Sequence, residues 1–308
     1  MITYYVNNRG FEVSDHWVEG CWTCVVEPNE DETGFLVNGL DIPESFLSDI
    51  DDKEERPRRE EEDGWQLIVI RVPFRCNESH IDYNTVPLGI IIKDNVFVTV
   101  CNSKVEMVDD FVVYSIRKQL DVTNPYELVM RLMLSSSVWF LKYLKHINIR
   151  IMNIEGRLQE NVRNEEILEL QRLENSLVYF VTSLKGNDIL FYRMAHTKAI
   201  SAVCDEELIE DVEIELKQAE ETTSIYRNII HSMSNSYSSV ISNNINQTMK
   251  TLTSISIIMM LPTLIASLYG MNVPNYFESE PFAFFYILGG ATFLGLLMYL
   301  FFKRRNLF

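Results

Sequence analysis

Charged residues are unevenly distributed along the chain, and two long segments near the C-terminus contain none. No charged residue occurs in 251–277 or in 282–302, whereas the chain before Lys250 is mixed and charge-rich. A helix needs about 20 apolar residues to cross a hydrocarbon core of about 30 Å. Segments 251–269 and 282–302 meet this requirement, so the pattern predicts two membrane-spanning helices.

The flanks of these segments predict their orientation. The linker, 270–281, is short, so the two helices form an antiparallel hairpin with both far ends on one side of the membrane. Lys250 precedes the first helix and the basic tail 303–308 follows the second, and the positive-inside rule places such ends in the cytoplasm. We therefore expect a protein of the plasma or inner membrane, with cytoplasmic termini and an extracellular loop at 270–281.

The first 124 residues predict a cytoplasmic α/β domain with a mostly buried sheet. The run 66–72 is apolar with alternation, as in a strand. Two further apolar runs, 90–92 and 96–101, are separated by Lys93-Asp94-Asn95 and predict a β-hairpin. The dense charge run 49–63 predicts a solvated loop or the end of a helix.

From residue 125 to residue 250 the pattern becomes helical. Asn124 is a good N-cap and Pro125 suits the first helical position, so one helix is expected from there to about residue 159. A second helix is expected over 164–185, ending at Gly186.

A third helix is predicted to begin near Asp205 and to continue into the first membrane span. No proline or glycine interrupts it before Pro262. A stretch of about 63 helical residues would be roughly 95 Å long at 1.5 Å per residue. The predicted fold is therefore an α+β cytoplasmic domain with an α/β/α sheet, then a long helical stalk and two C-terminal transmembrane helices.

Composition narrows the classes of function. The 308 residues include 44 acidic and 27 basic ones, a net charge of −17, and only Glu278 and Glu280 among the acids follow residue 250. The first 250 residues are therefore strongly acidic, and such a domain would repel nucleic acid and attract cations. The alternative interpretation is that the net charge only keeps the domain soluble. The sequence has no P-loop, nucleophile elbow or histidine-rich site. We therefore expect that the protein is not an enzyme and that it needs no cofactor.

The five cysteines predict neither a disulfide framework nor a metal site. Cys21 and Cys24 form a lone CxxC in an apolar run typical of a strand. A zinc site needs about four ligands, and the sequence offers no second CxxC or nearby histidine pair.

One face of the first predicted span carries small polar and thioether side chains at spacings of three and four, which places them in one stripe on a helix. The opposite positions, such as Ile255, Ile258, Leu261 and Ile265, are aliphatic. Two interpretations remain open: helix packing, which small and hydroxyl residues often mediate, and a pore wall. Two helices cannot enclose a pore, so transport would require a homo-oligomer. The stripe comprises Asn246, Met249, Thr253, Ser256, Met260, Thr263 and Ser267.

The span ends in Tyr269-Gly270-Met271-Asn272, which resembles the Gly-Met-Asn signature of the CorA family of divalent metal-ion transporters. The motif lies at the end of the penultimate span, before a short acidic loop and a basic C-terminus, as in that family. The resemblance extends through 246–252 and 260–263. More loosely it covers the whole chain, including Glu55-Arg56-Pro57-Arg58 before a predicted strand.

This resemblance implies a homopentamer with a funnel-shaped cytoplasmic part and a pore lined by the first membrane helix. It implies a selectivity filter of Gly270, Met271 and Asn272, in which Asn272 selects a hydrated ion. The pore-lining positions implied by the family are Asn246, Met249, Leu252, Met260 and Thr263. Leu252 is adjacent to Thr253 of the stripe.

The resemblance also implies closure by intracellular Mg²⁺ bound at acidic sites between cytoplasmic domains. Asp211 falls where one such aspartate lies, and Glu207 and Glu210 add oxygen ligands nearby. A solvated acidic helix face would show the same pattern. The loop departs from many relatives, which have Met-Pro-Glu-Leu there; in this chain the acids are displaced to Glu278 and Glu280, which still attract cations.

Three functions are compatible with the sequence. The first is Mg²⁺ uptake driven by the membrane potential and gated by intracellular Mg²⁺, with cobalt as a related ion. The second is Zn²⁺ transport of the ZntB type. The third is a membrane-anchored sensor that conducts nothing. The expected partners are further copies of the chain, the lipid bilayer and divalent cations, but not nucleic acid.

Overall fold

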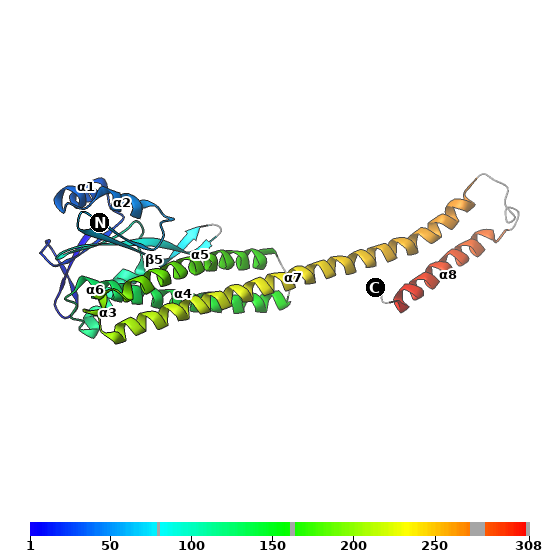
Figure 1. The fold of residues 1–308 in the computed structure, drawn as a ribbon. Coiled ribbons are helices and arrows are strands. Elements are labelled where there is room, and N and C mark those ends of the chain that lie inside the picture. The colour runs from blue at the N-terminus through cyan, green and yellow to red at the C-terminus, as the bar shows by residue number, and fades with distance from the viewer. Residues whose placement is uncertain (79–80, 161–163, 272–280, 306–308) are drawn as a thin grey trace. The chain divides into compact units, whose positions relative to one another are not determined.

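The chain folds into two compact units, Met1–Ser234 and Asn235–Phe308. The structure is a computed structural model, and it describes residues 1–78, 81–160, 164–271 and 281–305 (Figure 1). The helix α7 (Glu206–Tyr269) begins in the first unit and ends in the second.

The first unit is built on a mixed sheet of seven strands in the order β2-β1-β3-β7-β6-β5-β4. Only β3 and β7 are parallel neighbours, and every other pair is antiparallel. The strands are β1 (Ile2–Asn7), β2 (Phe11–Ser14), β3 (Trp22–Val26), β4 (Arg58–Glu62), β5 (Trp65–Glu78), β6 (Ile81–Lys93) and β7 (Val96–Cys101).

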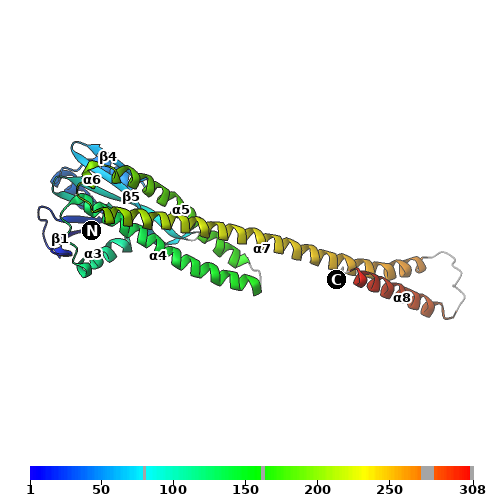
Figure 2. The ribbon, with the colours of Figure 1, turned by 60° about the horizontal axis from the view of Figure 1, so that its bottom comes forward.

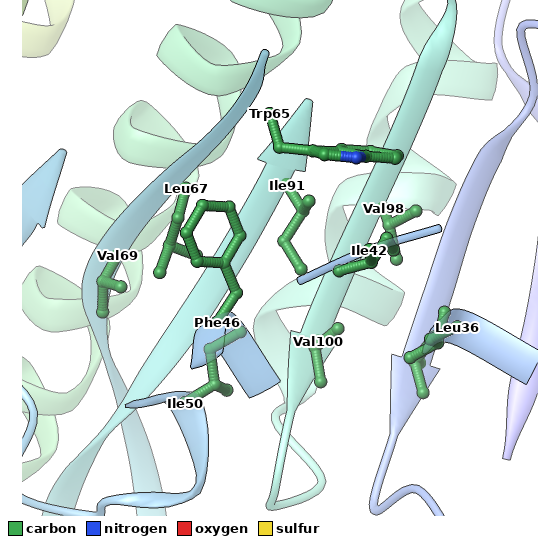
Figure 3. Close-up of a cluster of buried hydrophobic side chains, with 11 residues drawn as sticks. Leu36, Ile42, Phe46, Ile50, Trp65, Leu67, Val69, Ile91, Val98 and Val100 are labelled. Carbon is green, nitrogen blue, oxygen red and sulfur yellow. The ribbon is translucent and has the colours of Figure 1, made fainter. Parts of the chain in front are cut away.

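Short helices cover one face of the sheet. These are α1 (Glu30–Gly34), the π-helical turn η1 (Phe35–Gly39) and α2 (Glu44–Asp51). Leu36, Phe46 and Ile50 point from them onto Leu67, Ile91 and other sheet residues that are almost fully buried (Figure 3). Burial of these side chains fixes this layer on the sheet.

Two long helices, α4 (Pro125–Glu160) and α5 (Asn164–Ala195), cover the other face (Figure 1). Asn187 of α5 accepts from the backbone N–H of Arg71 at 2.9 Å and donates to its carbonyl at 2.8 Å. Ser136 of α4 donates to the same carbonyl at 3.2 Å. These buried bonds attach both helices to β5, and the predicted α/β/α sheet domain is confirmed.

Several predicted boundaries are confirmed as well. The Asn124 side chain accepts from the N–H of Tyr126 at 2.9 Å, and α4 begins at Pro125. Strands β6 and β7 form the predicted hairpin, with Lys93 paired to Val96. Asp94 in its turn has a φ of 47°, the left-handed conformation that two-residue hairpin turns require. The remaining helices of the first unit are α3 (Glu106–Lys118) and α6 (Lys198–Ser201).

The predicted end of the second helix at Gly186 is wrong. Helix α5 continues through Gly186 to Ala195. A Cβ on this residue would lie 2.7 Å from Cγ of Pro57, closer than side chains approach one another. Gly186 therefore allows α5 to lie against the chain just before β4, rather than ending the helix.

The charge run 49–63 also contains more structure than predicted. It holds the end of α2 and the edge strand β4, which pairs with β5. Arg58 forms ion pairs with Asp49, Glu55 and Glu60. A charged strand is tolerated at a sheet edge, where it discourages pairing with other chains, so charge alone did not indicate a loop.

Substitution of Gly186 by alanine tests this packing. Alanine is normally better than glycine inside a helix by about 1 kcal/mol, but here its Cβ would meet the stiff Pro57 ring. We expect Gly186→Ala to lower the thermal unfolding temperature of the protein.

The matched control is Gly156→Ala in α4, where no atom lies within 4 Å of the added Cβ. This change should raise the unfolding temperature slightly, as helix propensity predicts. Equal stabilisation by the two changes would contradict the proposed contact with Pro57.

Candidate functional site

The second unit contains the end of α7 and the helix α8 (Ala283–Arg304). Within the part of the chain that the structure describes, these are the two helices long and apolar enough to cross a membrane. The most apolar 18-residue segment of α7 has a mean hydropathy of 1.8, and 6% of it is buried. The corresponding segment of α8 has a mean hydropathy of 1.9, and 11% of it is buried. They coincide with the two uncharged segments of the sequence.

Helix α8 touches one face of α7 at a few positions. Ser254 of α7 is only 4% exposed, and Ile258, Leu261 and Ile265 on the same face are half-buried. The helices meet beside a small residue, since a Cβ on Gly295 of α8 would lie in ordinary contact, 3.7 Å from Cγ of Pro262. Close packing at small residues is usual between membrane helices, because side-chain fit rather than water drives their association.

The polar stripe lies on the opposite face of α7. With 3.6 residues per turn, its centre is about half a turn from the face that packs on α8. Met249, Leu252 and Met260 are 57%, 58% and 66% exposed. The remaining stripe residues are exposed as well: Asn246, Thr253, Ser256, Thr263 and Ser267. Packing against α8 within the chain therefore does not account for most of the stripe, although Thr263 also borders a groove beside α8.

Hydroxyl groups on this face have a defined orientation. Ser256 donates to the carbonyl of Leu252 at 2.9 Å, and Thr263 donates to that of Met259 at 2.8 Å. Because each hydrogen is used within the helix, the oxygen presents lone pairs to its surroundings. Such oxygens accept hydrogen bonds, as the outward-pointing hydrogens of water around a cation require.

The Gly-Met-Asn signature lies at the end of α7. The N–H of Gly270 donates to the carbonyl of Ala266 at 2.9 Å, so helical bonding extends to this residue, and Met271 is exposed. Asn272, Glu278 and Glu280 lie outside the described residues. Beside Gly270, the end of α7 and the start of α8 border an apolar groove of about 550 Å³ that also takes in Thr263.

The three acids proposed from the sequence as a regulatory metal site lie at the start of α7. Glu207, Glu210 and Asp211 are all exposed. Asp211 borders a groove of about 310 Å³ together with Asp110 of α3. Across residues 1–78, 81–160, 164–271 and 281–305 of a single chain, no three His, Cys, Asp or Glu side chains are close enough together to hold a metal ion.

The structure supplies an acidic neighbour that the sequence did not reveal. Asp110 accepts from Trp139 Nε1 at 3.0 Å, which fixes the carboxylate beside the groove that Asp211 borders. Glu106, Asp109 and Asp110 make the exposed face of α3 acidic. That cluster was the available signal, but only tertiary packing brings α3 next to α7.

The CxxC motif lies in the sheet, as its apolar context indicated. Cys21 and Cys24 are both buried, and Cys24 belongs to β3. Burial raises the pKa of the Cys24 thiol to about 11 and that of Cys101 to about 12. A metal ligand or redox nucleophile needs the thiolate, so a raised pKa favours inert core packing.

Comparisons with known proteins converge on one family. The family model described as "CorA-like Mg2+ transporter protein" matches residues 18–304. The "Cobalt/magnesium transport protein CorA" of Methanocaldococcus jannaschii is 27% identical over 265 residues, which is 82% of this chain and 79% of that protein.

Solved structures share the fold. The complete CorA magnesium transporter of Methanocaldococcus jannaschii superposes with a TM-score of 0.82 at 21% identity, covering 99% of this chain and 98% of that one. The full-length CmaX protein gives 0.71 at 15% identity, with 98% and 96% covered. The ZntB cytoplasmic domain of Vibrio parahaemolyticus gives 0.61 at 9% identity, with 80% and 98% covered.

Proposed function

The chain belongs to the family of CorA-like Mg²⁺ transporter proteins, and on that premise we propose that it conducts Mg²⁺ into the cell down the membrane potential. Membership makes it a membrane transport protein rather than an enzyme. The observation that carries the proposal is the polar stripe of α7, which is exposed, faces mostly away from α8 and presents acceptor oxygens.

Conduction needs several copies of the chain. One α7 and one α8 enclose no channel, whereas a ring of chains with their stripes turned inward does. A homopentamer is the assembly we propose, following the family resemblance. The apolar remainder of both helices then faces lipid or neighbouring copies, in keeping with its exposure in the single chain.

The chemistry of the stripe suits a hydrated divalent ion. Mg²⁺ gives up its water reluctantly, and neutral amide and hydroxyl oxygens can bind the outer face of its water shell. No acidic side chain lies on the stripe, and a strongly binding site would hold a divalent ion too long for conduction. Met249, Leu252 and Met260 would form apolar constrictions that close by dewetting.

The driving force comes from the membrane potential. With an interior-negative potential, entry yields about 2.3 kcal/mol per charge per 100 mV, so roughly twice that for a divalent ion. We propose cytoplasmic termini, an extracellular loop and a location in the plasma or inner membrane. Glu278 and Glu280 of that loop would raise the local concentration of cations.

Zn²⁺ is the alternative ion, because the fold also resembles that of the ZntB cytoplasmic domain. Protein sites for Zn²⁺ use thiolate, imidazole and carboxylate ligands. The stripe has only amide, hydroxyl and thioether groups. Its chemistry therefore favours Mg²⁺, with Co²⁺ as a further ion suggested by the name of the archaeal relative.

Loss of the proposed filter residue gives the first test. With Gly270 and Met271, Asn272 would form the ring that selects the hydrated ion at the end of α7. We expect Asn272→Ala to abolish Mg²⁺ uptake into proteoliposomes and to leave the oligomer intact in size-exclusion chromatography. Asn275→Ala, the same change in the same loop, should retain uptake. Wild-type flux in Asn272→Ala would sink the assignment of the filter.

The stripe has its own test, using an isosteric change. Thr263→Val removes the acceptor oxygen from the pore-facing side and should reduce Mg²⁺ flux about tenfold, since hydrogen bonds involving charged groups contribute about 1.5–3 kcal/mol. Thr292 of α8 also donates to the carbonyl four residues before it, but it lies off the stripe. Thr292→Val should leave flux unchanged, and equal effects of the two changes would count against a pore at the stripe.

Regulation by internal Mg²⁺ is proposed to act through Asp211, with Glu207 and Glu210 nearby. Asp211→Lys should raise the internal Mg²⁺ concentration needed for half-inhibition by about tenfold, a typical size for coupling between sites. Glu213→Lys makes the same charge change on the opposite side of α7 and should have little effect. If both variants respond to Mg²⁺ like the wild type, Asp211 is only surface charge.

A further inference from the structure

Helix α4 exposes a basic and apolar stripe on the first unit. Val138, Ile149 and Met152 are 45%, 51% and 61% exposed, which is high for apolar side chains. Lys142 and Lys145 lie between them and are exposed as well. Spacings of three and four place all five on one face of the helix. We call this face the α4 stripe.

The first part of α7 exposes a matching acidic and apolar stripe. Ile214 and Ile225 are 52% and 56% exposed. Glu207, Glu210 and Glu221 are exposed on the same side of the helix, and Lys217 lies at its border. The buried face of this part of α7, with Val212, Leu216 and Ala219, points the other way. We call the exposed face the α7 stripe.

The two stripes have the same spacing. From Val138 the α4 stripe reaches Lys145 after seven residues and Ile149 after four more. From Ile214 the α7 stripe reaches Glu221 after seven residues and Ile225 after four more. Aligned in parallel, they set Ile214 against Val138, Glu221 against Lys145 and Ile225 against Ile149. The same register sets Glu207 against Arg131, seven residues or about two turns before Ile214 and Val138.

The direction of the helices permits this alignment between copies. Within the first unit, α4 and the beginning of α7 run the same way (Figures 1 and 2). In a ring of copies related by rotation about an axis parallel to these helices, every helix keeps its direction. An α7 stripe on one copy can then meet the α4 stripe of the next in parallel, and each copy uses both stripes once. Such a heterologous contact closes into a ring.

Charges of opposite sign at matching positions specify the partner. Among the residues that the structure describes, neither Lys145 nor Glu221 forms an ion pair within its own chain. The Lys142 ammonium group lies over the Trp139 ring, 3.5 Å from the ring centroid. The positive charge of Lys142 therefore stays on the α4 stripe. Arg131 pairs with Glu127 at 2.7 Å and would share its charge with an incoming Glu207.

Nearby charges limit the contact to the part of each stripe that follows Lys142 and Lys217. Around Val138 the α4 stripe enters the groove of about 310 Å³, where Asp110, Asp211 and Glu215 are accompanied by Arg117 and Arg131. A neighbour's Glu210 gains little there, and Lys217 would lie beside Lys142 in this register. Lys145 and Ile149, set against Glu221 and Ile225, give the complementary part of the surface.

We propose that the α7 stripe of one copy docks on the α4 stripe of the next, with Ile225 against Ile149 and Glu221 paired with Lys145. The proposal rests on the ring assembly of the proposed function and identifies the surface that builds it. Exposed apolar side chains that alternate with charges of complementary sign on the two faces are the arrangement by which interfaces specify their partner.

Cysteine cross-linking in membranes containing the full-length protein tests the contact. One tagged chain carries Ile149→Cys and a second, differently tagged chain carries Ile225→Cys. Of the natural cysteines, Cys21, Cys24, Cys101 and Cys204 are buried and Cys76 is half-buried. Mild oxidation should give a dimer containing both tags, and either variant alone should give none.

Matched controls separate this surface from general proximity. Ile189 is a comparably exposed isoleucine on α5, at 55%, and Ile189→Cys with Ile225→Cys should give no dimer. Lys145→Glu on the Ile149→Cys chain should lower the yield by up to about fivefold, the range of an exposed ion pair. Adding Glu221→Lys to the Ile225→Cys chain should restore it.

The interface and the transport function fail independently. Absence of the mixed dimer, equal dimer formation with Ile189→Cys, or dimers of a single variant would overturn the proposed contact. If Mg²⁺ flux persists in such membranes, the proposed function stands without this interface. A mixed dimer in membranes that carry no divalent flux would support the contact and count against transport.

Discussion

The packing of α8 against a single face of α7 determines what the rest of α7 can do. Ser254 is buried on that face, and Gly295 of α8 lies beside Pro262, so the contacts with α8 lie on that side of α7. Everything on the opposite face is left for lipid, for other copies or for an aqueous path. Because that face carries Asn246, Ser256 and Thr263 in register, an aqueous path accounts best for its composition.

Helical backbone bonding makes such a path compatible with a membrane. In the bilayer core the backbone polar groups must be paired within the helix, and Ser256 and Thr263 add their hydroxyl hydrogens to the same carbonyl ladder. The oxygen atoms of these hydroxyl groups are neutral and remain free to accept hydrogen bonds. A hydrated divalent ion needs such acceptors and is retained less than it would be by carboxylates.

The sequence predicted the parts of the fold that depend on local chemistry. The N-cap at Asn124, the hairpin turn at Asp94 and the two uncharged C-terminal helices follow from single residues or runs, and the structure confirms these elements. Gly186 and the charged strand β4 were misinterpreted because their roles depend on distant partners, Pro57 and β5. For the same reason Asp110 was not paired with Asp211, since only the packing of α3, α4 and α7 brings them to one groove.

The central claim is that the chain conducts divalent cations and favours Mg²⁺. Flux into proteoliposomes with an imposed interior-negative potential tests it most directly, with Mg²⁺, Co²⁺ and Zn²⁺ supplied in turn and protein-free vesicles as the background. We predict potential-dependent Mg²⁺ entry well above that background, and slower Zn²⁺ entry. Background flux for all three ions would contradict conduction, and entry of Zn²⁺ alone would contradict the assignment of the ion.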